Sequence, residues 1–185
     1  MSRGDRPQRQ DPVQKAKLLD GGLVTLRRLR RSDTDAVIAL HTQLTDRERY
    51  FRFFATHPAH METFAAKLVQ RTAKQYAVGA FQNGQLIGVA SYVASDDPGE
   101  AEMAVAVAHR DHLRGVATVL LRNLAEAARR RGIRYFTAYV LAENTLMLKV
   151  LRDIGWPSTK TYQGPILQIR LDLSADGSAV DAYRG

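Results

Sequence analysis

Residues 101–131, AEMAVAVAHRDHLRGVATVLLRNLAEAARRR, contain the pattern that decides the fold. An apolar run from Ala101 to Ala108 ends at a polar segment. Leucines and alanines then recur at three- and four-residue steps until Gly132. The run is typical of a strand, and the second half is typical of an amphipathic helix whose last turn carries Arg129–Arg131. A strand, a glycine-containing turn and a helix start leave backbone N–H groups free for a phosphate.

The composition is that of an ordinary globular domain. The chain has 185 residues, of which 45% are hydrophobic and 25% charged, and this length favours a single domain with its own core. It has no cysteine, which excludes disulfides, thiol nucleophiles and cysteine-based metal sites. No apolar stretch reaches the roughly 18–20 residues needed to cross a bilayer, and the first residues lack the apolar segment of a signal peptide. We therefore expect a cytoplasmic protein with no membrane partner.

The net charge of +8 favours polyanionic ligands. The cations are scattered, however, and the sequence has no basic helix with interleaved aromatics and no zinc-finger spacing. Nucleic acid is therefore disfavoured as the main ligand, because a polyanionic cofactor or an acidic protein surface explains the same excess. We expect no metal site, since no metal-ligand spacing is found among His41, His57, His60, His109 and His112.

The order of elements predicts a mixed α/β sheet with helices on its faces. We expect a flexible tail at residues 1–20, a folded domain at 21–173 and a polar tail at 174–185. The Asn83-Gly84 pair is a strong hairpin signal between two of the strands. The expected strands begin near residues 23, 76, 86, 100, 135, 159 and 166, and the expected helices near 32, 45, 60, 116 and 143.

Two of these helix starts carry capping signals. Ser32 has a carboxylate three residues later, and Thr45 is followed by Glu48 at the same spacing. The second start leads into Arg49-Tyr50-Phe51-Arg52-Phe53-Phe54, where four aromatics either line a cleft or pack in the core. We expect core packing for at least two of them.

The element order and two motifs together resemble the GNAT acetyltransferase superfamily. His112-Leu113-Arg114-Gly115-Val116-Ala117 is similar to its acyl-CoA motif, Gln/Arg-x-x-Gly-x-Gly/Ala, in everything but the first residue. Glu143-Asn144, leading to Gly155-Trp156, is similar to the family's later helix, which begins with Asn and ends in Gly-Phe. Asp46 to Phe54 and Ala101-Glu102 look like elements of the bacterial Pat-type protein lysine acetyltransferases. The resemblance spans residues 23–173 and implies a single GNAT-like domain with a mostly antiparallel central sheet.

The resemblance implies acetyl-CoA as the cosubstrate, bound without a metal. The amides expected around its pyrophosphate are those of Arg114, Gly115, Val116, Ala117 and Thr118, at the positive end of a helix dipole. Gly115 lets the backbone approach the ligand, while the Arg114 guanidinium adds a charged contact and Thr118 a hydroxyl. By the same resemblance, main-chain groups of Val105 and Val107 pair with the pantetheine arm. The alternative is an ordinary strand–turn–helix whose glycine serves tight packing.

Glu102 is the expected general base. An ordinary lysine has a pKa near 10.4, so the amine must lose a proton before it attacks a thioester. Alternation places Glu102 on one strand face with Ala104, Ala106 and Ala108, whose small side chains leave room for a substrate. It also matches the glutamate expected to act as base in Pat-type enzymes. The alternatives are an ion pair at the strand edge, or Glu100, expected in the preceding loop, as the base.

Two positions depart from the family pattern. His112 replaces the usual Gln or Arg, which weakens a phosphate contact or makes it pH-dependent. Leu151 stands where many members have a tyrosine that protonates the leaving thiolate. The thiolate then leaves unassisted, or it receives a proton from Tyr139 or another group. Asn144 either contacts the CoA arm or caps its helix, and the sequence favours neither role.

The sequence thus predicts an N-acetyltransferase that moves acetyl from acetyl-CoA directly to an amine, with a protein lysine as the leading acceptor. A small-molecule amine acetyltransferase is the alternative within enzymes. A non-catalytic acyl-CoA-binding sensor is an alternative from another class. Nucleic-acid binding, a third class, predicts affinity that falls steeply with salt.

Overall fold

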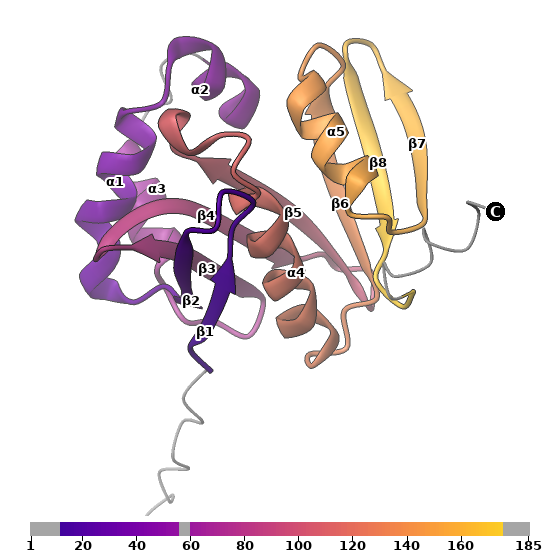
Figure 1. Ribbon diagram of the computed structural model, residues 1–185. Coiled ribbons are helices and arrows are strands. Elements are labelled where there is room, and N and C mark those ends of the chain that lie inside the picture. The colour runs from indigo at the N-terminus through magenta and orange to yellow at the C-terminus, as the bar shows by residue number, and fades with distance from the viewer. Residues whose placement is uncertain (1–11, 56–59, 176–185) are drawn as a thin grey trace, which may run out of the picture.

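In the computed structural model, eight strands form one sheet in the order β1-β2-β3-β4-β5-β6-β8-β7 (Figure 1). The structure describes residues 12–55 and 60–175. The strands are β1 (Gln14–Lys17), β2 (Leu23–Arg28), β3 (Gln75–Gln82), β4 (Gln85–Ala94), β5 (Glu100–Val107), β6 (Tyr135–Leu141), β7 (Ser158–Gln163) and β8 (Ile166–Asp172). Neighbouring strands are antiparallel except for β5 and β6, which are parallel. This confirms the predicted mixed, mostly antiparallel sheet.

Helices cover both faces of the sheet (Figure 1). Face A carries α4 (Val116–Arg129) and α5 (Thr145–Asp153). Face B carries α1 (Thr34–Thr42), α2 (Asp46–Phe53) and α3 (Met61–Leu68). Two short 3-10 helices, η1 (Arg31–Asp33) and η2 (His109–Asp111), precede α1 and α4. Within the described ranges, no helix has both the length and the apolar character to cross a membrane.

Each face has its own apolar core. On face A the stripe of α4 packs on the sheet, and Leu120, Leu121 and Leu124 are fully buried. Gly88 of β4 permits this close approach, because a Cβ there would lie 2.9 Å from a methyl carbon of Leu120. The smaller core of face B consists of Leu29, Val37, Leu40, Ala65, Leu68, Val69, Ala77, Leu86, Val89 and Ala108. The sheet is therefore held mainly from the α4 side.

The local signals gave mixed results. Asn83 and Gly84 both have positive φ between β3 and β4, as the hairpin prediction requires. Thr45 and Glu48 form the predicted capping box of α2. The Ser32 prediction was wrong, since α1 has Asp33 at its N-cap position. The Asp33 carboxylate binds the Arg27 guanidinium at 2.8 Å and the Arg30 amide at 2.7 Å, and these contacts fix the turn.

The N-terminal prediction also differs from the structure. The expected tail at residues 1–20 includes β1, which pairs antiparallel with β2. Leu18, just after β1, is buried in the face A core, and its amide donates to the Gly22 carbonyl at 2.8 Å. That apolar anchor explains why the segment is ordered. Residues 1–11 and 176–185, which complete the two expected tails, lie outside the described residues.

Candidate functional site

Strands β5 and β6 pair at one end only. Their parallel pairing ends at Glu102, opposite Thr137. Strand β5 nevertheless remains paired with β4 up to Val107, and β6 with β8 up to Leu141. The facing edges of β5 and β6 therefore part beyond Glu102, and their backbone groups there have no partner strand between them.

Main-chain groups of β5 point into this opening. The Ala108 amide donates to the Ile87 carbonyl on the β4 side at 2.9 Å. Because N–H and C=O directions alternate along a strand, those of Val107 and Val105 point away from β4 and toward β6. The Val107 carbonyl accepts a hydrogen bond from His112 Nε2 at 3.0 Å. The geometry thus supports the predicted pantetheine contacts of both valines.

A cavity of about 520 Å³ occupies the opening between β5 and β6. Its wall includes parts of α2, η2, α4 and α5 as well as both strands. The predicted cofactor-binding residues that line it are Val105, Val107, Gly115, Val116, Ala117, Thr118 and Asn144. Arg114 and Glu102 are not part of this wall. The structure therefore brings most of the predicted site residues together.

The N-terminus of α4 presents free amides to the cavity. The first intrahelical hydrogen bond joins the Val119 amide to the Gly115 carbonyl at 3.1 Å. The amides of residues 116–118 precede that bond, as expected at a helix start. Gly115 has φ of 84°, and a Cβ there would lie 3.1 Å from Leu19 Cγ. Both the left-handed backbone and the close approach of Leu19 therefore require glycine.

The Arg114 side chain is held by the protein itself. Its guanidinium donates to Asp20 at 2.6 Å, to Asp111 at 2.5 Å and to Gln82 at 3.0 Å. The hydrogen bonds that Arg114 donates to Asp20 and Asp111 raise the pKa of Arg114, and the bond from Arg114 lowers the pKa of Asp20. The charged contact that we expected Arg114 to offer a phosphate is thus directed at two carboxylates.

Leu19 belongs to the site but was missed in the sequence. It lies in the turn between β1 and β2, its amide donates to the Arg114 carbonyl at 3.0 Å, and its side chain lines the cavity while 82% exposed. The available signal was Asp20-Gly21-Gly22, a turn pattern between two short segments. We read the segment before it as a tail because QKAK is too short to show a clear period.

The two glutamates of β5 have different surroundings. Glu102 is exposed on face B. Burial lowers the pKa of Arg52 in α2 to about 10, and the charge of Glu102 acts in the opposite direction. Glu100 accepts two hydrogen bonds from Arg170, at 2.6 and 2.9 Å. It begins β5 rather than lying in the loop as expected. Of the two carboxylates, Glu102 is therefore the one that forms no ion pair with the residues that the structure describes, and its side chain is exposed.

The structure also shows the surroundings of Asn144, Leu151 and Tyr139. Asn144 Oδ1 accepts from the Met147 amide at 3.1 Å, so Asn144 caps α5 while also lining the cavity. Leu151 is buried in the face A core. Tyr139 of β6 lines the cavity and is 38% exposed. Tyr139, the side chain considered as a proton donor to the leaving thiolate, is thus part of the cavity wall.

The aromatics of α2 only partly follow the prediction. Phe53 packs against His41 and Phe64, with ring centroids 5.6 and 5.1 Å away. Phe51 lines the cavity, whereas Tyr50 and Phe54 are 37% and 42% exposed. Core packing thus holds for one aromatic rather than two.

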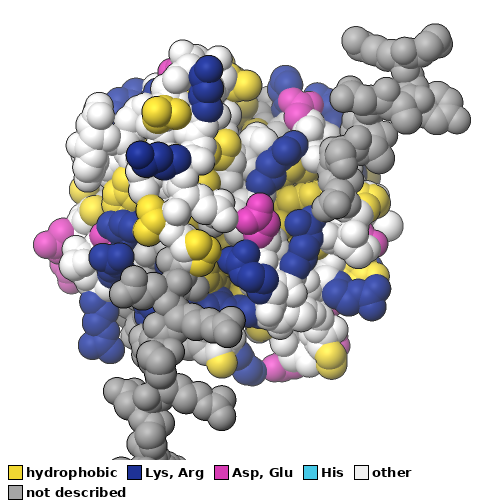
Figure 2. Space-filling model, turned by 60° about the horizontal axis from the view of Figure 1, so that its bottom comes forward, with side chains coloured by type: hydrophobic (Ala, Val, Ile, Leu, Met, Phe, Trp, Pro, Cys, Tyr) yellow, Lys and Arg dark blue, Asp and Glu magenta, His cyan; other side chains and the backbone are white. Residues whose placement is uncertain are grey.

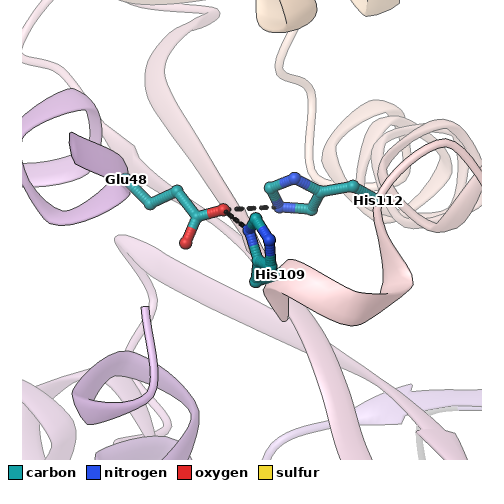
Figure 3. A group of neighbouring side chains, drawn as sticks. All are labelled: Glu48, His109 and His112. Carbon is teal, nitrogen blue, oxygen red and sulfur yellow. Dashed lines mark hydrogen bonds and ion pairs between the residues drawn. The ribbon is translucent and has the colours of Figure 1, made fainter. Parts of the chain in front are cut away.

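A cluster of Glu48, His109 and His112 lies on the cavity wall (Figure 3). Glu48 Oε1 is 2.7 Å from His109 Nδ1 and 3.5 Å from His112 Nε2. Burial acts to raise the pKa of Glu48, but hydrogen bonds from His109 and Thr45 outweigh it and lower that pKa. Sequence analysis did not identify this group, because its third member, Glu48, is 61 residues from His109. His57, another of the histidines considered above, lies outside the described residues.

Comparison with known proteins identifies the family. The profile of the acetyltransferase (GNAT) domain matches residues 24–156, and the chain belongs to this family. An acetyltransferase of Pseudomonas aeruginosa is 28% identical over 143 residues, which make up 74% of this chain and 76% of the relative.

Solved structures of other proteins share the fold of this chain. The GNAT domain of PAT from Streptomyces lividans is 27% identical with a TM-score of 0.79, and the match covers 86% of this chain and 96% of that domain. The PaiA N-acetyltransferase of Thermoplasma acidophilum, solved with coenzyme A, is 15% identical with a TM-score of 0.64. The match covers 80% of this chain and 98% of that one, and it is a likeness of fold alone. The expected closeness to Pat-type enzymes is confirmed, and the chain is an N-acetyltransferase of the GNAT type.

Proposed function

We propose that this enzyme transfers acetyl from acetyl-CoA directly to the ε-amine of a protein lysine, with Glu102 as the general base. The observation that carries the proposal is the position of Glu102. It is the last residue of β5 that pairs with β6, and it lies on face B where the two strands part. Face A carries α4, whose N-terminal amides would hold the pyrophosphate. Cofactor and acceptor would then reach one opening from opposite faces.

The cofactor contacts follow from the free backbone groups. Amides 116–118 and the dipole of α4 favour the charge of the pyrophosphate. The pantetheine arm would run along β5, where the main-chain groups of Val107 and Val105 face the cavity. The Val107 carbonyl keeps a second lone pair for the arm while it accepts from His112.

The chemical step needs one base and one route for the leaving group. Glu102 would take a proton from the lysine ammonium, and the neutral nitrogen would attack the thioester carbonyl carbon. The carbon–sulfur bond then breaks, the CoA thiolate leaves with the electron pair, and the nitrogen releases its second proton to solvent to give the neutral amide. Tyr139 would give a proton to the sulfur, and its position on the wall of the same cavity supports this role.

The surface around Glu102 favours a protein as the acceptor. Val93, directly across from Glu102 in β4, is 52% exposed, and Tyr139 is 38% exposed. Small amines are usually bound in enclosed pockets, whereas a lysine on a protein surface needs an open approach. Figure 2 shows the cations of one face dispersed among uncharged groups rather than gathered in a stripe. That dispersion supports a cofactor or protein partner over nucleic acid.

Cofactor binding is tested first, by calorimetric titration with acetyl-CoA. Substitution of Gly115 would strain the backbone and press on Leu19, so Thr118 is the better position. Thr118→Glu places a negative charge beside the expected pyrophosphate, while a carboxylate in the first helical turn does not harm α4 itself. We expect at least tenfold weaker binding, with a much smaller change in the neutral control Thr118→Gln. Equal affinity in all three proteins would exclude the pyrophosphate from this helix start.

The base is tested by turnover. Glu102→Gln keeps the shape of the side chain but accepts no proton. We therefore expect the turnover rate to fall by a factor of about 100 or more, at unchanged acetyl-CoA affinity. The matched control is Glu100→Gln, two residues away and engaged by Arg170, for which we expect a rate within about twofold. Released CoA can be read with a thiol reagent, because the protein has no cysteine. A Glu102→Gln enzyme with the wild-type rate would remove the assignment.

The acceptor class is tested in the same assay. Folded proteins with exposed lysines and a panel of small amines are offered in parallel. Acetylation of the proteins with little reaction of the small amines is the expected result. The reverse preference would favour the small-molecule acetyltransferase, and binding of acetyl-CoA without transfer to any amine would favour the sensor.

A further inference from the structure

We propose that Glu48, His109 and His112 form a binding site for Zn²⁺ on the wall of the cavity. The donor atoms are Glu48 Oε1, His109 Nδ1 and His112 Nε2, and all three lie within 4.8 Å of one another. They come from the first turn of α2 and from the segment around η2, which Figure 3 shows facing each other. The inference is independent of the proposed function, because it concerns binding of a metal to the free protein.

The spacing of the donors suits a tetrahedral ion. Zinc–ligand bonds of about 2.0–2.1 Å place neighbouring ligand atoms roughly 3.3 Å apart. Glu48 Oε1 and His112 Nε2 are already 3.5 Å apart, and the contact from Glu48 to His109 need only lengthen from 2.7 Å. To bind zinc, His112 Nε2 gives up its proton and its hydrogen bond to the Val107 carbonyl. Two imidazoles and one carboxylate are a donor set that zinc prefers over Mg²⁺ or Ca²⁺.

The backbone explains why the two histidines point the same way. η2 is a 3-10 helix that ends with His112 as its C-cap. Side chains three residues apart in a 3-10 helix lie one above the other. The rings of His109 and His112 accordingly have centroids 5.5 Å apart. A His-x-x-His pair in this conformation presents both rings to one point in space.

The carboxylate is also oriented by its surroundings. Glu48 Oε2 accepts from the Thr45 amide at 2.8 Å in the capping box of α2, which leaves Oε1 to the two histidines. Hydrogen bonds of this kind, one step beyond the ligands, typically set the orientation of metal-binding groups. The Glu48 side chain is 16% exposed and that of His109 69% exposed, so the site is sheltered and still accessible to an ion. Three protein ligands leave a fourth position open toward the cavity.

The test is a calorimetric titration of metal-free protein with ZnCl₂ in the absence of CoA. We expect one ion per chain with a Kd in the micromolar range or below. Glu48→Gln, His109→Gln and His112→Gln should each weaken binding at least tenfold. Glutamine ligates zinc poorly at all three positions. At 48 its amide oxygen can accept the capping bond, and at 112 its amide nitrogen can donate to the Val107 carbonyl. The matched control is His60→Asn, an exposed histidine with positive φ outside the cluster, which should bind as the wild type does.

Two spectroscopic measurements on the wild-type protein test the same zinc site without substitutions. Co²⁺ in a tetrahedral site should give visible absorption that Zn²⁺ displaces, and zinc should shift the imidazole ¹⁵N resonances of His109 and His112. No binding tighter than about 100 μM, or equal binding by the three glutamine variants and the wild type, overturns the proposal. The failure of this site would leave the acetyl-CoA titration and the Glu102 test untouched.

Discussion

The two faces of the sheet are stabilised by different interactions. Face A is held by a continuous apolar core in which the leucines of α4 have no exposed surface. Face B combines a smaller apolar core with buried or half-buried ionisable groups. His41 packs between Phe53 and Phe64, and the Arg52 guanidinium lies 4.9 and 5.3 Å from the centroids of the same two rings.

This difference matches the two tasks that we assign to the faces. The amides that we expect to hold the pyrophosphate belong to α4, so their position depends on apolar packing that does not change with pH. The proposed acceptor side carries groups whose charge can change. The cofactor side should therefore behave as a rigid scaffold, and the acceptor side should respond to acid.

The largest expected effect tests the rigidity of face A. Leu120→Ala removes a fully buried side chain between α4 and β4, where the close approach at Gly88 leaves little freedom to collapse. We expect a loss of about 3–4 kcal/mol in the free energy of unfolding. Urea denaturation monitored by circular dichroism measures it.

The counterpart on face B is Leu40→Ala. Leu40 in α1 is also buried, but its core is smaller and bordered by partly buried side chains that can move into the space. We expect about 2 kcal/mol. Equal losses for the two variants would contradict the claim that face A is the more tightly packed of the two.

The sequence predicted face A better than face B. The apolar period of α4 and the Asn83-Gly84 turn are local patterns, so a single stretch of chain is enough to read them. The glycine before α4 likewise marked the helix start that lines the cavity. The resemblance to the GNAT family rested in part on the segment that leads into α4, and the family match confirmed it.

The contacts that sequence analysis missed join distant segments. Glu48 meets His109 across 61 residues, and Asp20 meets Arg114 across 94. A local pattern carries no information about such pairs. Even the short-range error at Ser32 has this origin, because Asp33 is fixed by Arg27 of β2 and not by the helix that follows.

A further expected effect tests the acid response of face B. The pKa of His41 is lowered to about 4, mainly by burial. The hydrogen bond to the Val37 carbonyl acts to raise this pKa, and the nearby charge of Arg52 acts to lower it. In the unfolded chain the same group titrates near 6.5. Between those values the unfolded state binds the extra proton, so stability falls as pH falls from about 6.5 and the loss is complete near pH 4. At one pKa unit per 1.36 kcal/mol, the loss reaches about 3 kcal/mol.

His41→Phe should remove this slope, because a phenyl ring keeps the contacts with Phe53 and Phe64 and has no proton to bind. Unfolding free energies from urea titrations between pH 7 and 4.5 make the comparison. The control Leu120→Val should lower the whole curve and leave its slope as in the wild type, since face A gains or loses no charge. Asp33 does not confuse the result. Burial acts to raise its pKa, but hydrogen bonds from Arg27 and the Arg30 amide lower it, so its contribution is lost only at more acidic pH. A His41→Phe protein with the wild-type slope would place the acid response outside face B and remove the distinction between the two faces.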